Sequence, residues 1–468
     1  MTTFAEAVKS TPAVARTENG MRAKAHSGNV LVDLFYKIGA SRGKSVTADF
    51  ERAFQEDADL AMKIAFWSRD VRGGAGERQI FRDILLHLEK LHPVTLEKAM
   101  PFVAEFGRWD DLLIFKTEKF KHMAYTLIGD ALRERNGLAA KWMPRQGPIA
   151  IEIRNFYGMT PKQYRKSLVA LTNVVESKMC AQDWDGIEFG KLPSLASARY
   201  NKAFAKNATA SYEAYKARLT KGTDKVNASA VYPYDVLKTL QRGDQTMAVK
   251  QWDALPNYME GNNERVLPVC DVSGSMSSPA GNNANLSCMD VCISLGLYIS
   301  ERNEGKFKDA FVTFSESPKL QYLNGKLNDR YRQLQQADWG MSTNLEAVFT
   351  LVLNQATKFN LPESEMPTTL LIMSDMEFNQ ATRSSQSALD MIRTKYESAG
   401  YTMPKLVFWN IQSRNSGNYP VQVTDSGTAL VSGFSPAILK SLLTGEDMSP
   451  VGIMNKTVHS ARYEPITA

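Results

Sequence analysis

A short apolar run that ends abruptly in polar residues places the strongest constraint on the fold of this chain. Residues 266–270 read Val-Leu-Pro-Val-Cys, and Asp271, Ser273, Gly274 and Ser275 follow directly. An apolar run bounded by turn residues predicts a buried parallel strand. In open α/β sheets, ligands bind beyond the carboxyl ends of such strands. The sequence therefore predicts a binding site immediately after residue 270.

The polar residues at this strand end are hard oxygen donors at alternate positions. Asp271, Ser273 and Ser275 offer one carboxylate and two hydroxyls. Such a set suits a cation that accepts few protein ligands and keeps some of its waters, and Mg²⁺ is the ion that fits this description. The alternative is a helix N-cap formed by Asp271 and Ser273, because these residue types commonly cap helices.

The Asp-x-Ser-x-Ser pattern after a hydrophobic strand resembles the metal-ion-dependent adhesion site of von Willebrand factor A domains. That family adds a threonine on a second loop and an aspartate at the end of a later strand. Thr343 and Asp375 occur in this order, the latter after the apolar run 370–373. The resemblance implies a Mg²⁺ site that consists of Asp271, Ser273, Ser275, Thr343 and Asp375.

The acidic turn 374–378 departs from the family pattern. Many A domains place a glycine after the aspartate, whereas this chain has Met376 and then Glu377. The extra carboxylate would crowd or supplement the metal shell. A magnesium ion held in this way keeps an open position, which the carboxylate of a partner protein can fill.

The second half of the chain alternates between predicted strands and helices. A chain of 468 residues is expected to form two or three domains. The alternation predicts a mainly parallel, doubly wound sheet with an antiparallel edge hairpin at 311–323. We expect strands near 266–270, 307–314, 318–323, 369–374, 405–411 and 421–431, and helices near 285–302, 328–336, 344–357, 383–398 and 435–443.

The first half reads as helical. Apolar residues recur at helical spacing from Val30 to Ile38, again between Phe50 and Trp67, and once more from Ile80 to Leu88. Helix pairs at irregular spacing indicate an α-solenoid. Residues 1–28 are small and polar and are predicted to form a flexible arm.

Positive charge is concentrated in the first half. The chain has 56 Lys/Arg and 50 Asp/Glu; residues 261–468 hold 17 and 20 of these, which leaves 39 and 30, a net charge of +9, for residues 1–260. A summed positive potential attracts phosphate, so a nucleic acid is the leading partner for this half. The alternative is an ordinary solvated helical surface.

Several segments combine basic residues with glycine or aromatic residues. Residues 69–78 could cradle phosphate through backbone N–H groups, or form a tight turn between helices. Residues 197–207 interleave cations with Tyr200 and Phe204, which fits either stacking on single-stranded bases or a helix core. The RNA-contact candidates are Arg69, Arg72, Arg78, Lys141, Arg145, Lys162, Arg165, Lys166, Arg199, Lys202 and Lys206.

A basic helical half before an A domain resembles the Ro/TROVE family of RNA-binding proteins. Closer similarity to a phage and bacterial group related to that family lies in residues 72–78, 107–111 and 231–234. The resemblance implies HEAT-like repeats at 29–260, an A domain at 261–445 and a tail at 446–468. It further implies a monomeric ring and a ribonucleoprotein that binds single-stranded RNA ends or small noncoding RNA. A cytoplasmic location is expected because the first residues have neither the basic nor the apolar region of a signal peptide.

Enzymatic function is not expected. No nucleophile and base stand in a recognisable arrangement, and the five histidines have no metal-ligand spacing. His87 and His92, five positions apart, are interpreted as capping or surface residues. The four cysteines are interpreted as reduced thiols, and no stretch is long and apolar enough for a membrane span. A non-enzymatic RNA-binding scaffold is the first hypothesis, and a protein-binding adaptor that docks a partner carboxylate is the alternative.

Overall fold

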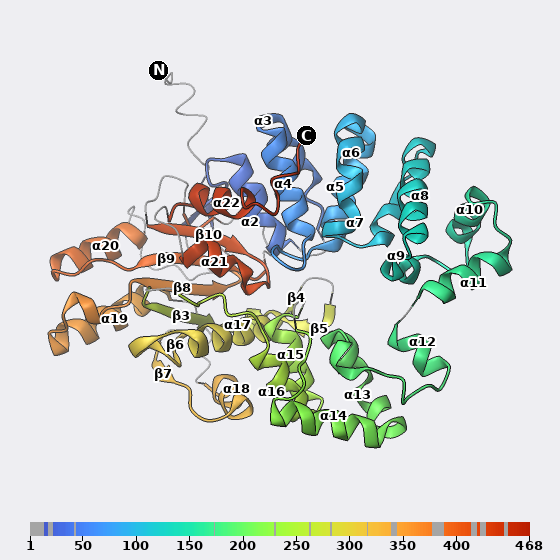
Figure 1. Cartoon of the computed structure of the whole chain (residues 1–468). Helices are drawn as coiled ribbons and strands as arrows, with labels where there is room; N and C mark the ends of the chain where they lie inside the picture. The colour runs from blue at the N-terminus through green and yellow to red at the C-terminus, as the bar shows by residue number, and fades with distance from the viewer. Residues whose placement is uncertain are drawn as a thin grey trace.

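The computed structural model places a largely helical part before a mixed α/β part (Figure 1). This order confirms the coarse fold predicted from the sequence. We call residues 30–253 the helical arc and residues 264–468 the α/β unit. The structure describes residues 14–16, 22–41, 44–172, 174–228, 231–261, 264–280, 283–315, 317–337, 344–376, 388–412, 419–421, 427–443 and 448–468.

The helices of the arc follow the apolar periodicity of the sequence. Asn29 caps the first helix, because its side-chain oxygen accepts hydrogen bonds from two backbone N–H groups, and Asp57 caps the third by accepting from the N–H of Leu60. The helices are α2 (Val30–Ala40), α3 (Thr47–Glu56), α4 (Ala58–Arg69), α5 (Arg78–Leu91), α6 (Pro93–Ala99), α7 (Val103–Phe106), α8 (Glu118–Arg133), α9 (Gly137–Trp142), α10 (Pro148–Phe156), α11 (Pro161–Leu171), α12 (Val175–Cys180), α13 (Ser194–Asn207), α14 (Thr209–Lys221), α15 (Pro233–Gln241) and α16 (Gln245–Asp253).

Short 3₁₀ turns lie within the arc, and a small hairpin precedes it. The turns are η1 (Met100–Phe102), η2 (Trp109–Ile114) and η3 (Phe189–Lys191). The hairpin consists of β1 (Val14–Arg16) and β2 (Arg22–Lys24), which lie within the predicted arm. Lys24 and Tyr419 exchange two backbone hydrogen bonds of 2.9 Å, so the end of this hairpin is tied to the α/β unit.

The α/β unit is built on a six-stranded sheet in the order β10-β9-β8-β3-β6-β7. All neighbouring strands are parallel except β7, which pairs with β6 in the antiparallel edge hairpin that the sequence predicts. The strands are β3 (Val266–Asp271), β6 (Ala310–Phe314), β7 (Leu320–Tyr322), β8 (Thr369–Ser374), β9 (Lys405–Asn410) and β10 (Thr428–Ser432), and β4 (Pro279–Ala280) and β5 (Asn283–Ser287) form a separate hairpin.

Helices flank this sheet; those before residue 446 lie close to their predicted positions, whereas the helix after residue 446, where a tail was expected, was not predicted. They are α17 (Cys288–Arg302), α18 (Leu327–Gln335), α19 (Leu345–Phe359), α20 (Ala388–Ser398), α21 (Leu439–Leu443) and α22 (Pro450–Val458), with 3₁₀ turns η4 (Gly274–Ser277), η5 (Gly305–Phe307), η6 (Glu363–Glu365) and η7 (Pro436–Ile438). Every residue of strand β3 is buried. This explains why its sequence is almost entirely apolar.

Both ends of the helical arc pack against the α/β unit. At the first end, α2 contacts β10, and α22 contacts α2 and α4; at the other end, α15 contacts α17. Figure 1 shows the helices α3 to α14 between these two anchors, following a curved path away from the sheet. A single apolar core runs from the first helices of the arc into the α/β unit. A second, smaller core lies between residues 175 and 247.

The last residues of the chain return to the first helices. Ala468 donates a backbone hydrogen bond to Asp59 on α4 at 2.7 Å, and Arg462 and Tyr463 both contact the buried carboxylate of Asp70. The Tyr463 ring also stacks on Phe106, with 5.6 Å between ring centroids. The segment after 446 therefore includes a packed helix and an anchored end. Across the described ranges, no helix combines the length and apolarity that crossing a bilayer requires.

Candidate metal centre and candidate nucleic-acid surface

Four of the five residues predicted to bind metal, Asp271, Ser273, Ser275 and Asp375, lie at or directly after the carboxyl ends of two adjacent strands. β3 ends at Asp271, and β8 ends one residue before Asp375. The two strands pair in parallel, with Cys270 opposite Met373. The chain leaves β3 for β6 on one side and returns to β8 on the other, so the site lies at the topological switch point of the sheet. The fold thus brings together two carboxylates that lie far apart in the sequence.

Asp271 is fully buried and is held by neighbouring polar groups. One carboxylate oxygen accepts a hydrogen bond from the backbone N–H of Ser273 at 3.0 Å, and the other accepts from the hydroxyl of Ser374. Burial, and after it the charge of Asp375, raises the pKa of the Asp271 carboxyl well above the usual range of an aspartate. Ser374 was not among the predicted site residues, although its place directly before Asp375 in the acidic turn was a signal.

The two predicted hydroxyl ligands lie beside each other after the strand. The Oγ atoms of Ser273 and Ser275 are 2.9 Å apart, and Ser273 is 5% exposed. The 3₁₀ turn η4 begins directly after Ser273, and the Met276 N–H donates to the carbonyl of Ser273 at 3.1 Å. We call Asp271, Ser273, Ser275 and Asp375 the strand-end site. Thr343 and Glu377 lie outside the described residues.

The donor set of the strand-end site fits a hard divalent cation. Every side chain of the site offers oxygen as the metal-ligand atom, and two of the four side chains are buried carboxylates. Carboxylate and hydroxyl oxygens are ligands that Mg²⁺ accepts. Met376, after the second aspartate, has a φ of +63°, the left-handed region in which glycine is most comfortable. In this chain a methionine, and not a glycine, holds that conformation directly after Asp375.

The glycine-rich segment between α4 and α5 is a closed turn. The backbone N–H groups of residues 72 to 77 all donate to acceptors within the protein: those of Arg72 and Gly73 to the Asp70 carboxylate, and the remaining four to backbone carbonyls. A side chain at Gly74 would lie 1.9 Å from the carbonyl oxygen of Trp67. Because these amides are already used, the tight-turn alternative describes the segment and the phosphate cradle does not.

Arg69 is buried in a network of arginines and aspartates. Its Nε donates to Asp111 at 2.8 Å, and the two side chains are 4% and 0% exposed. Arg82 binds both Asp110 and Asp111, and Arg108 binds Asp110. We call these five residues the Arg–Asp cluster. The proposed RNA contact of Arg69 is therefore wrong, because its guanidinium is enclosed and neutralised by the fold.

The sequence segments that carry the closer family resemblance meet in this region. Residues 107–111 supply the aspartates of the Arg–Asp cluster. A side chain at Gly76, in segment 72–78, would lie 2.3 Å from the hydroxyl of Tyr232, in segment 231–234. Segments 72–78 and 231–234 thus pack against each other, which joins the first helices to the end of the arc. Their first role is structural.

Most other basic candidates lie on exposed helical surface. Lys162, Arg165 and Lys166 on α11 are exposed, and so are Arg199, Lys202 and Lys206 on α13. Arg165 and Lys166 follow Lys162 by three and four residues, and Lys202 and Lys206 follow Arg199 by three and seven, so the members of each set lie on one broad helix face. We call these sets the α11 stripe and the α13 stripe. Arg72, Arg78 and Arg145 are also exposed, Lys141 is partly buried, and Arg145 donates to Thr172 at 3.3 Å.

The aromatic residues near the α13 stripe belong to the smaller core. Phe204 is fully buried, and its ring packs edge to face with Phe189 at a centroid distance of 5.2 Å. Tyr212 and Tyr215 are buried in the same core, and Tyr200 packs against it. For this segment the helix-core alternative is correct for Phe204, because a fully buried ring is inaccessible to bases.

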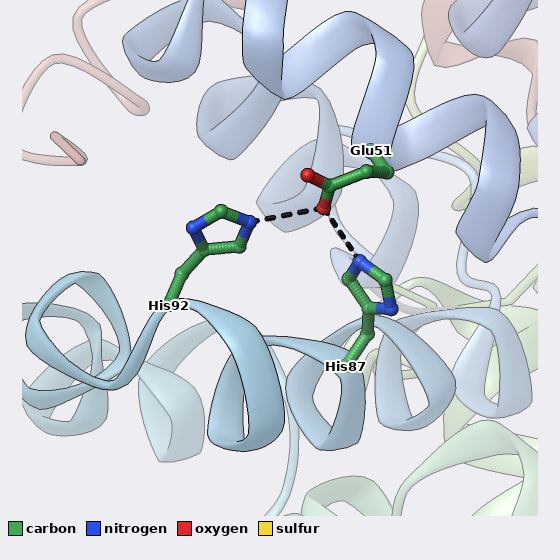
Figure 2. A group of neighbouring side chains, drawn as sticks. All are labelled: Glu51, His87 and His92. Atoms are coloured by element: carbon green, nitrogen blue, oxygen red, sulfur yellow. Dashed lines mark hydrogen bonds and ion pairs between the residues drawn. The ribbon is translucent and has the colours of Figure 1, made fainter.

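The structure also brings together three side chains that no sequence pattern connects. Both Nε2 atoms of His87 and His92 lie within hydrogen-bond distance of one carboxylate oxygen of Glu51, at 2.7 and 2.9 Å (Figure 2). His92 occupies the cap position between α5 and α6, and both histidines are partly exposed, as their interpretation as capping or surface residues expects, but the side chain of His92 bonds to Glu51 and makes no cap to α6. Glu51 lies 36 residues before His87, so only the packing of α3 on α5 reveals the group.

Comparisons with other proteins cover almost the whole chain. Residues 17–115 and 126–265, just over half of the 468 residues, match the family described as "Domain of unknown function (DUF2828)". Residues 265–463 match "Domain of unknown function (DUF7788)". An uncharacterized protein of Acanthamoeba polyphaga mimivirus is 32% identical over an alignment that spans 96% of this chain and 88% of the viral protein. The chain therefore belongs to the DUF2828 family, and its α/β unit carries the DUF7788 domain.

Proposed function

We propose that this protein is a non-enzymatic RNA-binding scaffold similar to Ro/TROVE proteins. The helical arc, formed of HEAT-like repeats, binds RNA, and the α/β unit acts as a von Willebrand factor A domain. The observation that carries the proposal is the distribution of charge. The net charge of +9 belongs to residues 1–260, and two exposed basic stripes lie on α11 and α13.

The stripes are suited to phosphate because their charges are not neutralised locally. Among the described residues, none of the six stripe cations forms an ion pair with a carboxylate. In the Arg–Asp cluster, by contrast, the cations are paired. Exposed cations without a carboxylate partner attract the phosphates of a polyanion and release its condensed counterions.

The buried rings limit how RNA is recognised. Because Phe204 is in the core, the α13 stripe contacts phosphate rather than stacking on bases. Binding through phosphate contacts is largely independent of base sequence and weakens steeply as salt rises. The proposed ligand is accordingly single-stranded or structured noncoding RNA bound by its backbone.

The strand-end site supports a docking role. Mg²⁺ held by Asp271, Ser273 and Ser275, with Thr343 and Asp375 as further ligands, would act as a Lewis acid for the carboxylate of a partner protein. Within the protein, Ser374 and the backbone N–H of Ser273 orient the Asp271 carboxylate. Docking through this site leaves the helical arc available for RNA.

Salt-dependent RNA binding by charge variants tests the proposal. Fluorescence anisotropy with a labelled single-stranded RNA is measured on the full chain over a salt series. Replacing all three cations of the α13 stripe by Gln should weaken binding and flatten the slope of log K against log salt by about 2, since each phosphate contact on a single strand contributes about 0.7. The same substitution in the α11 stripe should act similarly.

A matched control distinguishes local contacts from overall charge. Lys308, Arg332 and Lys358 are exposed on the α/β unit, and their triple Gln variant removes the same charge. It should leave the salt slope almost unchanged. If wild type shows no RNA binding at low salt, the RNA proposal fails, and the protein-binding adaptor becomes the better explanation.

A further inference from the structure

A second group of metal-ligand side chains lies in the helical arc, far from the strand-end site in sequence. Glu51 extends from α3, His87 from α5, and His92 follows the last residue of α5. Figure 2 shows both imidazoles directed at the same carboxylate. One potential ligand atom from each of the three lies within 4.8 Å of the others. We call this group the His–Glu cluster.

Neighbouring side chains hold the three groups in place. The Gln55 amide donates to the second oxygen of Glu51 at 3.0 Å. The rings of Phe54 and His92 have centroids 4.1 Å apart, and Phe50 meets the ring of His87 edge to face at 6.1 Å. Groups that orient a ligand from outside are a regular feature of protein metal sites. Here they come from the same helix as Glu51, one helical turn or less away.

The cluster is accessible to an ion from solvent. The side chains of His87, Glu51 and His92 are 18%, 22% and 23% exposed. Three protein ligands with solvent beside them match a site whose remaining positions are filled by water. Two imidazoles and one carboxylate favour a transition-metal ion over Mg²⁺, which prefers oxygen ligands alone.

We propose that Glu51, His87 and His92 bind one divalent transition-metal ion, with Zn²⁺ as the expected ion. Each imidazole then turns a lone pair on Nε2 toward the ion and carries its single proton on Nδ1. The ion bridges α3 and the end of α5, so its binding ties these helices together. This proposal is independent of the RNA and Mg²⁺ assignments, because it uses none of their residues.

Zn²⁺ affinity tests the proposal by competition with a chromophoric chelator. The full chain is used in a Cys180→Ser background, since Cys180 is an exposed thiol, and Mg²⁺ is kept in excess to fill any oxygen-ligand site. Wild type should bind one Zn²⁺. His87→Gln and His92→Gln each remove a ligand and should weaken binding by more than about 100-fold. Gln55→Leu removes only a group that orients Glu51 and should weaken binding by about 10-fold.

A histidine outside the cluster provides the matched control. His122 on α8 packs against Phe156 with ring centroids 4.9 Å apart, and His122→Gln should keep wild-type affinity. Thermal unfolding without metal checks that each variant folds, and Glu51→Gln offers a third ligand variant if a histidine variant does not. Equal Zn²⁺ affinity in wild type and the folded ligand variants would overturn the proposal. So would the absence of micromolar Zn²⁺ binding to wild type, which would leave the cluster as a hydrogen-bonded helix contact.

Discussion

The strand-end site and the Arg–Asp cluster both bury carboxylates, but their surroundings differ in charge. Asp111 is fully buried and accepts hydrogen bonds from Arg69, from Arg82 and from one backbone N–H. Asp271 is equally buried, yet it accepts from a backbone N–H and a hydroxyl, and its charged neighbour is Asp375. One carboxylate lies between opposite charges, and the other lies beside a like charge.

This difference separates a structural site from a candidate binding site. Buried charges are tolerated where opposite charges and hydrogen bonds compensate them, as they do around Asp111. At the strand-end site, the charge of Asp375 adds to burial in raising the pKa of the Asp271 carboxyl, and a cation bound between the two carboxylates would relieve this repulsion. The Arg–Asp cluster is complete within the chain, whereas the strand-end site is suited to an ion from outside.

The largest expected effect is on stability, from Asp111→Ala. The substitution leaves Arg69 buried without its carboxylate, so the free energy of unfolding should fall by about 3–5 kcal/mol. Urea denaturation measures the change. Asp110→Ala is the matched control; its side chain is 22% exposed, and its loss should be about 1 kcal/mol. Equal losses in the two variants would show that the enclosed pair is not what stabilises the cluster.

The next effect concerns Mg²⁺ at the strand-end site. At a concentration 100 times the Kd, Mg²⁺ should stabilise wild type by about 2.7 kcal/mol, and Asp271→Ala should abolish this gain. Thermal unfolding with and without Mg²⁺ gives the difference. Asp253→Asn, which removes an exposed carboxylate at the end of α16, should keep the full gain. A Mg²⁺ shift that is the same in Asp271→Ala and in wild type would contradict the assignment.

The sequence predicted the α/β unit well because its signals are local. Apolar strands bounded by turn residues and alternating with helices marked every strand of the main sheet, including the edge strand β7. Asp271 was likewise visible, since a polar pattern directly follows its strand. The placement of Asp375 beside it depends on β8 pairing with β3, and the resemblance to a known family supplied that step.

The sequence was less informative where function depends on packing between distant segments. Its charge beside a glycine-rich segment marked Arg69 as a candidate RNA contact, but only its distance to Asp111 shows that it is enclosed. Periodicity left Phe204 equally compatible with core and surface until the smaller core was seen. The His–Glu cluster had no local signal, because Glu51 and His87 meet through helix packing alone.

The smallest of these effects tests whether the helical arc and the α/β unit pack together as one body. A side chain at Gly39 on α2 would lie 2.5 Å from the backbone nitrogen of Gly433, directly after β10. Gly39→Ala must push the helix from the sheet, and after the gain in helix propensity we expect a net loss of about 2 kcal/mol in urea denaturation. Gly129→Ala on α8 would meet the ring of Tyr157 at 2.9 Å, and should lose less because a side chain gives way more readily than a backbone. If Gly39→Ala were as stable as wild type, α2 would not be held against β10, and the arc and the α/β unit would have to be considered separately.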